Sequence, residues 1–144
     1  MRDALVQIYL HCVWATWDRL PLISQDIEKG IYMSILEKCK EKDCVVLALG
    51  GTSAHVHLLV RFPSTISVAD FIKEIKGSSS HLVTHQLRPN EFFKWQGSYA
   101  AFSVSEKDLP RIKSYVDRQK EHHEDDHLEA TLEPMVKNSN PIEE

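Results

Sequence analysis

The stretch His55-Val56-His57-Leu58-Leu59-Val60 is apolar at every second position and predicts a strand with one face in a hydrophobic core. The two histidines then share the opposite face, less than about 7 Å apart at a rise of 3.3 Å per residue. Two imidazoles side by side can bind one divalent cation. Polar residues on the open face of a half-buried strand are also ordinary, so the pattern alone leaves a metal site and a plain solvated face both open.

The rest of the chain predicts strands and helices around this one. The predicted strands are residues 4–16, 44–49, 54–62 and 98–104, and the predicted helices follow Ser24, Ser67 and either Ser105 or Asp108. Gly50-Gly51 predicts the turn of a hairpin, and Gly77 predicts a bend in the second helix. This order favours an α+β fold, a ferredoxin-like antiparallel β-sheet with helices on one face.

Length and charge suit a single domain with a separate tail. The 144 residues divide into a domain at residues 1–124 and an acidic, mobile tail at residues 125–144. The net charge is −4, but residues 121–144 alone carry −7, which leaves +3 on residues 1–120. A mildly basic domain is compatible with a nucleic-acid partner without requiring one.

Cysteine content and hydropathy indicate the compartment. The three cysteines include no Cys-x-x-Cys pair, so we interpret them as reduced core residues rather than a disulfide framework or a zinc site. No apolar run approaches the ~18 residues of a membrane span, and no signal peptide is recognisable. We therefore expect a cytoplasmic protein with no membrane partner.

The last predicted helix carries a second set of polar residues. Tyr115 and Gln119 are four residues apart, so they lie on one side of the helix, beside the apolar stripe of Ile112 and Val116. A tyrosine at such an edge is more often a packing residue with a hydrated hydroxyl. It can also be a nucleophile for phosphate, although a phenol with a pKa near ~10 needs the help that a phosphate-bound metal supplies.

Several short motifs occur in an order and spacing that resemble a known family over most of residues 8–123. That family is the single-tyrosine HUH transposases of the smallest bacterial mobile elements, the insertion sequence 200/605 group, together with the related REP-associated tyrosine transposases. The matching motifs are His11-Cys-Val-Trp14 with Thr16, Arg19-Leu-Pro-Leu22, His55-Val-His-Leu-Leu-Val60, Ile75-Lys-Gly-Ser-Ser-Ser80, Trp95-Gln-Gly97, Tyr99-Ala-Ala-Phe-Ser-Val-Ser105 and Tyr115-Val-Asp-Arg-Gln119.

The resemblance implies roles that the pattern of residues does not establish. His55 and His57 would be metal ligands with Gln119 as the third, and the metal would be Mg²⁺ or Mn²⁺. Tyr115 would be the nucleophile, forming a 5′-phosphotyrosine and releasing a 3′-hydroxyl. The substrate would be single-stranded DNA with hairpins. The protein would be a homodimer in which the tyrosine helix of one subunit can complete the site of the other.

Three functions follow as hypotheses. The first is a transposase, a metal-dependent strand transferase that cuts and rejoins single-stranded DNA. The second is a domesticated protein that binds DNA or RNA hairpins without cutting them, and the third is a ferredoxin-like dimerisation module. Lys73, Lys76 and Ser79 are the candidate phosphate contacts, and a solvated helix end explains them equally well.

Overall fold

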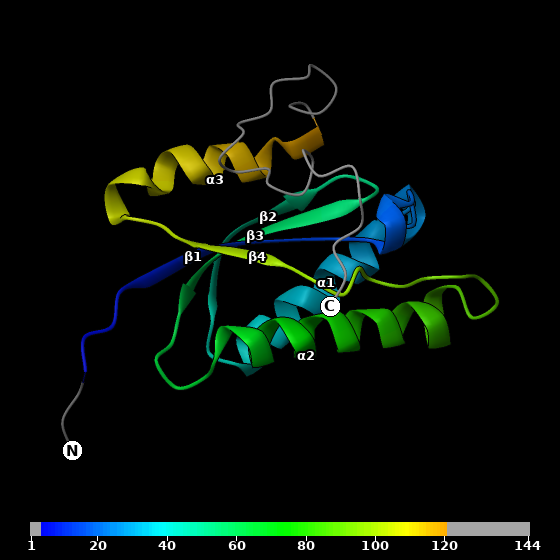
Figure 1. Cartoon of the computed structure of the whole chain (residues 1–144), viewed down its shortest axis with the longest axis horizontal. Coiled ribbons are helices and arrows are strands. Elements are labelled where there is room, and N and C mark those ends of the chain that lie inside the picture. Colours follow the sequence, from blue (N-terminus) through cyan, green and yellow to red (C-terminus); the bar gives the residue numbers. More distant parts are fainter. Residues whose placement is uncertain (1–3, 121–144) are drawn as a thin grey trace.

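The computed structural model describes residues 4–120 as a four-stranded antiparallel sheet with three α-helices (Figure 1). The strands lie in the order β2-β3-β1-β4, so β3 and β1 are central. The elements are β1 (Ile8–Ala15), α1 (Gln25–Glu41), β2 (Val45–Gly51), β3 (His55–Phe62), α2 (Val68–Leu82), β4 (Ala100–Ser103) and α3 (Leu109–Asp117), with short 3₁₀ turns at Trp17–Arg19 and Glu106–Asp108 and a π-helical turn at Val83–Leu87.

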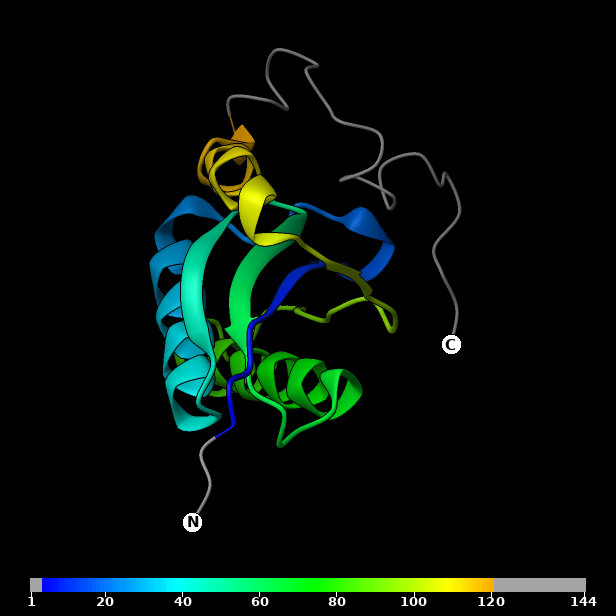
Figure 2. The same ribbon diagram turned by 90° about the vertical axis from the view of Figure 1, so that its left-hand side faces the viewer.

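The first six elements form the predicted ferredoxin-like core. Their order β1-α1-β2-β3-α2-β4, with β1 between β3 and β4, is that of a split βαβ unit, and α1 and α2 both cover one face of the sheet (Figure 2). The predicted α+β class with an antiparallel sheet is therefore confirmed. The predicted hairpin of the second and third strands is also present, with a register shift between Val46 and Ala48.

The main core lies between the sheet and these two helices, as the apolar alternation of β3 predicts. Val56, Leu58 and Val60 point into it and are fully buried. The helices contribute apolar residues at helical spacing, Ile27, Ile31, Ile35 and Cys39 from α1 and Phe71, Ile72 and Ile75 from α2. Burying each such side chain stabilises the fold by about 1.5–3 kcal/mol.

The prediction that all helices cover one face of the sheet is wrong for the third helix, α3. It crosses the opposite face of the sheet, above β2 and β3 (Figures 1 and 2). Leu59 and Ala48, which point away from the main core, form a second apolar cluster there with Ile112 and Val116 of α3. The sheet is therefore covered on both faces at this point, because β3 has an apolar residue on its histidine face as well.

Two glycine predictions were wrong. Gly50 and Gly51 end strand β2 and pair with His57 and Val56 instead of forming the hairpin turn. Gly77 lies inside α2, which continues without interruption to Leu82. The predicted acidic tail at residues 125–144 lies outside the described residues. Within residues 4–120, no helix is long and apolar enough to cross a membrane.

All three cysteines lie in the main core, as predicted. Cys12, Cys39 and Cys44 are buried and free. Burial raises the pKa of the Cys12 and Cys39 thiols to about 12, and that of the Cys44 thiol to about 11. The thiols are thus both shielded and protonated at neutral pH, which makes them poor nucleophiles.

We predict that the cysteine thiols of the folded protein react with Ellman's reagent at pH 8 only as fast as local or global unfolding exposes them. The thiolate is the reacting form, and both the raised pKa values and the packing keep it scarce. The absorbance of released thionitrobenzoate measures this, and adding urea should release the full three equivalents. Immediate reaction of all thiols in the native protein would show that this core packing is wrong.

Candidate active site

Two histidines on β3 form the centre of the candidate site. His55 and His57 lie on the face that α3 covers, and they are only 5 % and 0 % exposed. Their rings are 5.1 Å apart between centroids and meet edge to face. The predicted juxtaposition is present, but the pair lies inside the protein under α3 and not on an open, solvated face.

His55 is held from both sides of its ring. Its Nδ1 lies 2.8 Å from the Thr52 hydroxyl, at the tip of the β2–β3 hairpin. Its Nε2 lies 3.1 Å from the Oε1 atom of Gln119. Thr52 has no role in the sequence analysis, although a hydroxyl three residues before a candidate ligand histidine is a signal that could have indicated one.

His57 is held by a histidine of the neighbouring strand. Nε2 of His11, on β1, lies 2.7 Å from Nδ1 of His57, and the two rings stack with centroids 4.9 Å apart. His11 is fully buried. It belongs to the His11–Trp14 motif but received no function from the sequence, because only the register of β1 against β3 brings it beside His57.

The third helix brings the predicted nucleophile to the same place. Tyr115 lies with its ring 5.9 Å from that of His57, edge to face, and is 3 % exposed. Gln119 follows the end of α3, yet its amide nitrogen still donates to the Tyr115 carbonyl oxygen at 3.3 Å. The prediction that Tyr115 and Gln119 share one side therefore holds, although both are buried rather than at the edge of the core.

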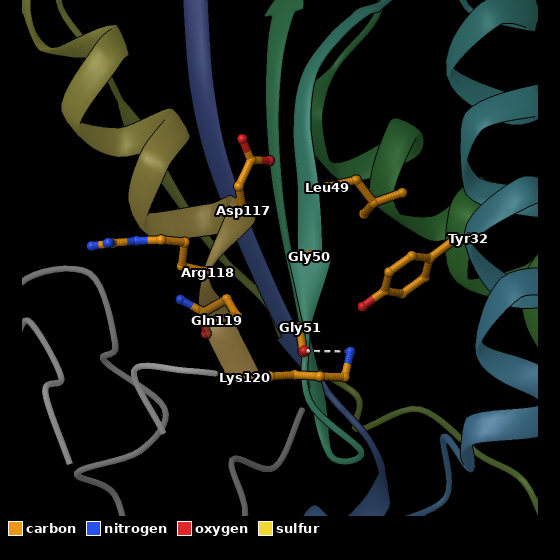
Figure 3. A pocket seen from close by; sticks show the side chains of 8 residues that line it. All are labelled: Tyr32, Leu49, Gly50, Gly51, Asp117, Arg118, Gln119 and Lys120. Atoms are coloured by element: carbon orange, nitrogen blue, oxygen red, sulfur yellow. Dashed lines mark hydrogen bonds between the residues drawn. The ribbon is translucent and has the colours of Figure 1, made fainter. Parts of the chain in front are cut away.

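Lys120 fastens the chain directly after Gln119. Its ammonium group lies 2.8 Å from the Glu28 carboxylate of α1, and it donates to the Gly51 carbonyl oxygen at 3.3 Å (Figure 3). The chain at Gln119 is thereby held by the contact to Tyr115 before it and by the contacts of this lysine after it. Helix α3 and the edge of the sheet are joined at the point where the histidines lie.

A close backbone approach sets the depth at which α3 packs. A Cβ atom on Gly50 would lie 2.2 Å from the carbonyl oxygen of Val116, far inside van der Waals contact. One on Gly51 would lie equally close to the carbonyl oxygen of His55. The Gly50-Gly51 pair is therefore required by packing and not by a turn. Any side chain at Gly50 would push away the helix that carries Tyr115.

A pocket of about 350 Å³ opens beside Gln119 (Figure 3). Its lining residues are Tyr32, Leu49, Gly50, Gly51, Asp117, Arg118, Gln119 and Lys120. Burial and, secondarily, the Glu28 carboxylate raise the pKa of Tyr32, so its hydroxyl is protonated at neutral pH. The pocket gives the site a polar opening between α1, the end of β2 and the residues that follow α3.

The three candidate phosphate contacts have different fates. Lys73 is exposed and lines a groove of about 400 Å³ between α2 and the segment at Gly97 and Tyr99. Lys76 donates to the carbonyl oxygens of Gln96 and Ser98 at 2.5 and 3.2 Å, so it also ties α2 to that segment. The prediction for Ser79 is wrong.

Ser79 is fully buried, which rules it out as a phosphate contact in this structure. Its hydroxyl donates to the Ile75 carbonyl oxygen at 2.7 Å and accepts from the Trp95 indole nitrogen at 2.9 Å. The residue thus stabilises the packing of Trp95 against α2. The sequence could not reveal this, because a serine within a helix has no pattern that distinguishes an exposed hydroxyl from a buried one.

The donor atoms fit a small divalent cation. Within residues 4–120, no three histidine, cysteine or acidic side chains are grouped to hold a metal, so the third protein donor would be an amide oxygen. Gln119 places that oxygen against Nε2 of His55, and His57 lies beside them. Two imidazoles with one amide oxygen form a mixed nitrogen and oxygen donor set, which can bind a divalent first-row metal ion such as Mn²⁺.

The fold and the site define the class of protein. The model of the family described as "Transposase IS200 like" matches residues 4–119, which is most of the chain and includes His55, His57, Tyr115 and Gln119. The chain belongs to this IS200-like transposase family, and the resemblance noted in its sequence is confirmed.

Individual relatives are distant in sequence. The ISDra2 transposase TnpA of Deinococcus radiodurans is 24 % identical over 123 residues, covering 82 % of this chain and 88 % of its own. A crystal structure of a putative transposase from Deinococcus radiodurans R1 superposes with a TM-score of 0.64 at 24 % identity, over 83 % of this chain and 95 % of the other. A REP-associated tyrosine transposase bound to a REP hairpin superposes with a TM-score of 0.66 at 14 % identity, over 85 % and 72 %.

We predict that Gly50→Ala destabilises the protein by about 1–3 kcal/mol, as overpacking does, because α3 has to move away from β2. The matched control is Gly77→Ala, where a Cβ meets nothing within 4 Å in the middle of α2. That change should stabilise by about 0.5–1 kcal/mol through helix propensity. Urea unfolding of both variants measures the difference, and equal effects of the two would contradict the close approach.

Proposed function

We propose that this transposase cuts and rejoins single-stranded DNA, with Tyr115 as nucleophile and His55, His57 and Gln119 as metal ligands. The observation that carries the proposal is the position of α3. It places a tyrosine and an amide oxygen from residues 115–119 beside two histidines from residues 55–57. A purely structural helix would need only its apolar stripe on the sheet.

The chemistry balances as a transesterification. The Tyr115 oxygen would form a bond to phosphorus, the bond from phosphorus to the 3′ oxygen would break, and the phenol proton would pass to that leaving oxygen through solvent or a neighbouring base. The product is a 5′-phosphotyrosine and a free 3′-hydroxyl. Attack by another 3′-hydroxyl reverses the step and joins strands. A cation at His55, His57 and Gln119 would supply charge neutralisation at the phosphate.

The protein residues contribute binding and orientation. Thr52 holds the His55 ring, and Gly50 allows α3 to approach. Tyr115 and Gln119 lie beside His57 and His55 of the same chain, an arrangement in which the tyrosine would act within its own subunit. A homodimer with the helix acting in the partner's site stays an alternative prediction.

The groove beside Lys73 offers a surface suited to the DNA strand. Lys73 supplies an exposed positive charge, and Tyr99, 37 % exposed, supplies an aromatic face on which a base can stack. A REP hairpin is the ligand in the structure of one relative, which supports a hairpin-bearing single strand as the substrate class here.

A second candidate function is favoured by the burial of Tyr115. At 3 % exposure, the tyrosine cannot reach a phosphate unless the end of α3 moves or the DNA displaces it. A protein that binds DNA or RNA hairpins without cutting them would have no need of that movement. The two candidates differ in one product, the covalent adduct.

We predict that the wild-type chain forms a covalent adduct with hairpin-bearing single strands of the DNA that flanks its gene, in the presence of Mn²⁺. The strands are labelled at the 3′ end, because the 5′-phosphotyrosine retains that fragment, and the adduct is measured by denaturing gel. Tyr115→Phe should abolish the adduct. Tyr9→Phe is the matched control. Tyr9 pairs with Arg61, at the end of β1 away from His55 and His57, so this change should leave the amount of adduct unchanged.

Tight hairpin binding without any adduct would reject cutting and support the second candidate. An undiminished adduct in Tyr115→Phe would reject the assigned nucleophile but keep strand cleavage. The two results are therefore distinguishable on the same gel.

We also predict that Lys73→Gln weakens binding of the same single strands and lowers the slope of log K against log salt by about 0.7–1, the loss of one phosphate contact. Fluorescence anisotropy at several salt concentrations measures the slope. Lys40→Gln removes another exposed lysine, one on α1, and its slope should equal that of the wild type. Equal slopes for all three proteins would exclude Lys73 from the DNA-binding surface.

A further inference from the structure

His11 touches one of the two candidate ligands, and the function described so far does not use it. It lies on β1 opposite Leu59, two residues along the strand from the pair Val13 and His57. Side chains two residues apart in this diagonal relation lie on one face of a sheet. The β1–β3 register therefore brings two fully buried imidazoles together on the histidine face of the sheet.

The contact defines which nitrogen of His57 can bind a metal. Nε2 of His11 is 2.7 Å from Nδ1 of His57, so one of these two nitrogens donates a hydrogen and the other accepts it. A neutral imidazole that binds a metal through Nε2 carries its hydrogen on Nδ1. In that state Nδ1 of His57 donates to His11, and His11 accepts.

The other candidate ligand is held in the same way. Nδ1 of His55 contacts the Thr52 hydroxyl, and Nε2 of His55 meets the Gln119 oxygen. A side chain thus contacts Nδ1 of each histidine. The partner is a hydroxyl for His55 and an imidazole for His57. Repetition of this arrangement on two rings is the pattern expected of partners that orient metal ligands and fix their tautomer.

We propose that His11 is a positioning residue for the metal site, which orients His57 and fixes the hydrogen on its Nδ1 atom so that Nε2 binds the cation. The inference rests on the proposed function, because it assumes that His57 is a ligand. A histidine that only filled the core would pack against any apolar neighbour. His11 instead stacks on His57 at an interplanar angle of 25° and hydrogen-bonds to it.

Two amide substitutions distinguish a His11 that orients the His57 ring from a His11 that only fills space in the core. The amide of glutamine overlaps the Nε2 position of histidine, whereas the shorter asparagine amide overlaps Nδ1. His11→Gln therefore keeps an acceptor within reach of His57, and His11→Asn withdraws it by about one bond, with similar polarity in both. His11→Leu removes the acceptor altogether. Cys12→Ala, the next residue on β1, loses packing in the main core without touching either ligand, and serves as the stability control.

The test is Mn²⁺ affinity of the full chain without DNA, measured from the free Mn²⁺ signal in electron paramagnetic resonance, together with thermal unfolding of each variant. His11→Leu and His11→Asn should weaken Mn²⁺ binding by about 10–100-fold, the usual effect of losing such a partner. His11→Gln should recover most of the affinity. Cys12→Ala should bind Mn²⁺ as the wild type does, even with a lower melting temperature.

The outcomes separate this inference from the function on which it rests. Unchanged affinity in folded His11→Leu, or equal affinity in His11→Gln and His11→Asn, would overturn the role of His11 alone. If His57→Ala binds Mn²⁺ as well as the wild type, or if the wild type binds none, the metal site itself is wrong and the role of His11 falls with it.

Discussion

The contact between α3 and the edge strand β2 is the constraint on which the candidate site depends. The Val116 carbonyl oxygen lies so close to Gly50 that even a methyl group would not fit. This approach lets Ile112 and Val116 bury against Leu59 and Ala48. The same apolar contact carries Tyr115 and Gln119 to the histidines. The placement of α3 on the sheet therefore determines both the packing of the second apolar cluster and the arrangement of the polar groups in the site.

Burial makes the polar interactions of the site consequential. His11, His57 and Gln119 are at most 1 % exposed. A buried polar group that loses its partner costs about 1–3 kcal/mol, so each of these side chains is strongly held in the orientation that its partner allows. The structure meets this demand with hydrogen bonds between strands, from the hairpin tip and from the end of α3. Such a network gives rigid, defined directions to the atoms that would bind a cation.

The ferredoxin-like core explains why this face of the sheet is available. Both crossover helices, α1 and α2, pack on the other face, which leaves the histidine face for an additional element. Helix α3 packs mainly over β2 and β3. The groove at Lys73 and Tyr99 lies beyond the sheet, between α2 and the segment before β4.

The sequence by itself determined which strands and helices form, which residues share one face of each, and the family. Alternation on β3 and helical spacing in α1 and α2 are local properties, because each side chain direction follows from the backbone repeat. The two histidines and the pair at Tyr115 and Gln119 could be assigned to common faces for the same reason. Tertiary structure alone decided that α3 lies on the second face, that Gly50 is a contact and not a turn, and that Ser79 is buried.

It also decided the position of His11 beside His57, which depends on strand register. Residues 11 and 57 are far apart in the chain, and no local pattern records which residue of β1 lies beside which residue of β3. A shift of one residue would turn His11 into the main core. Pairing between strands is set by the packing of the whole sheet, so the local sequence could supply the histidines while only the fold could bring them together.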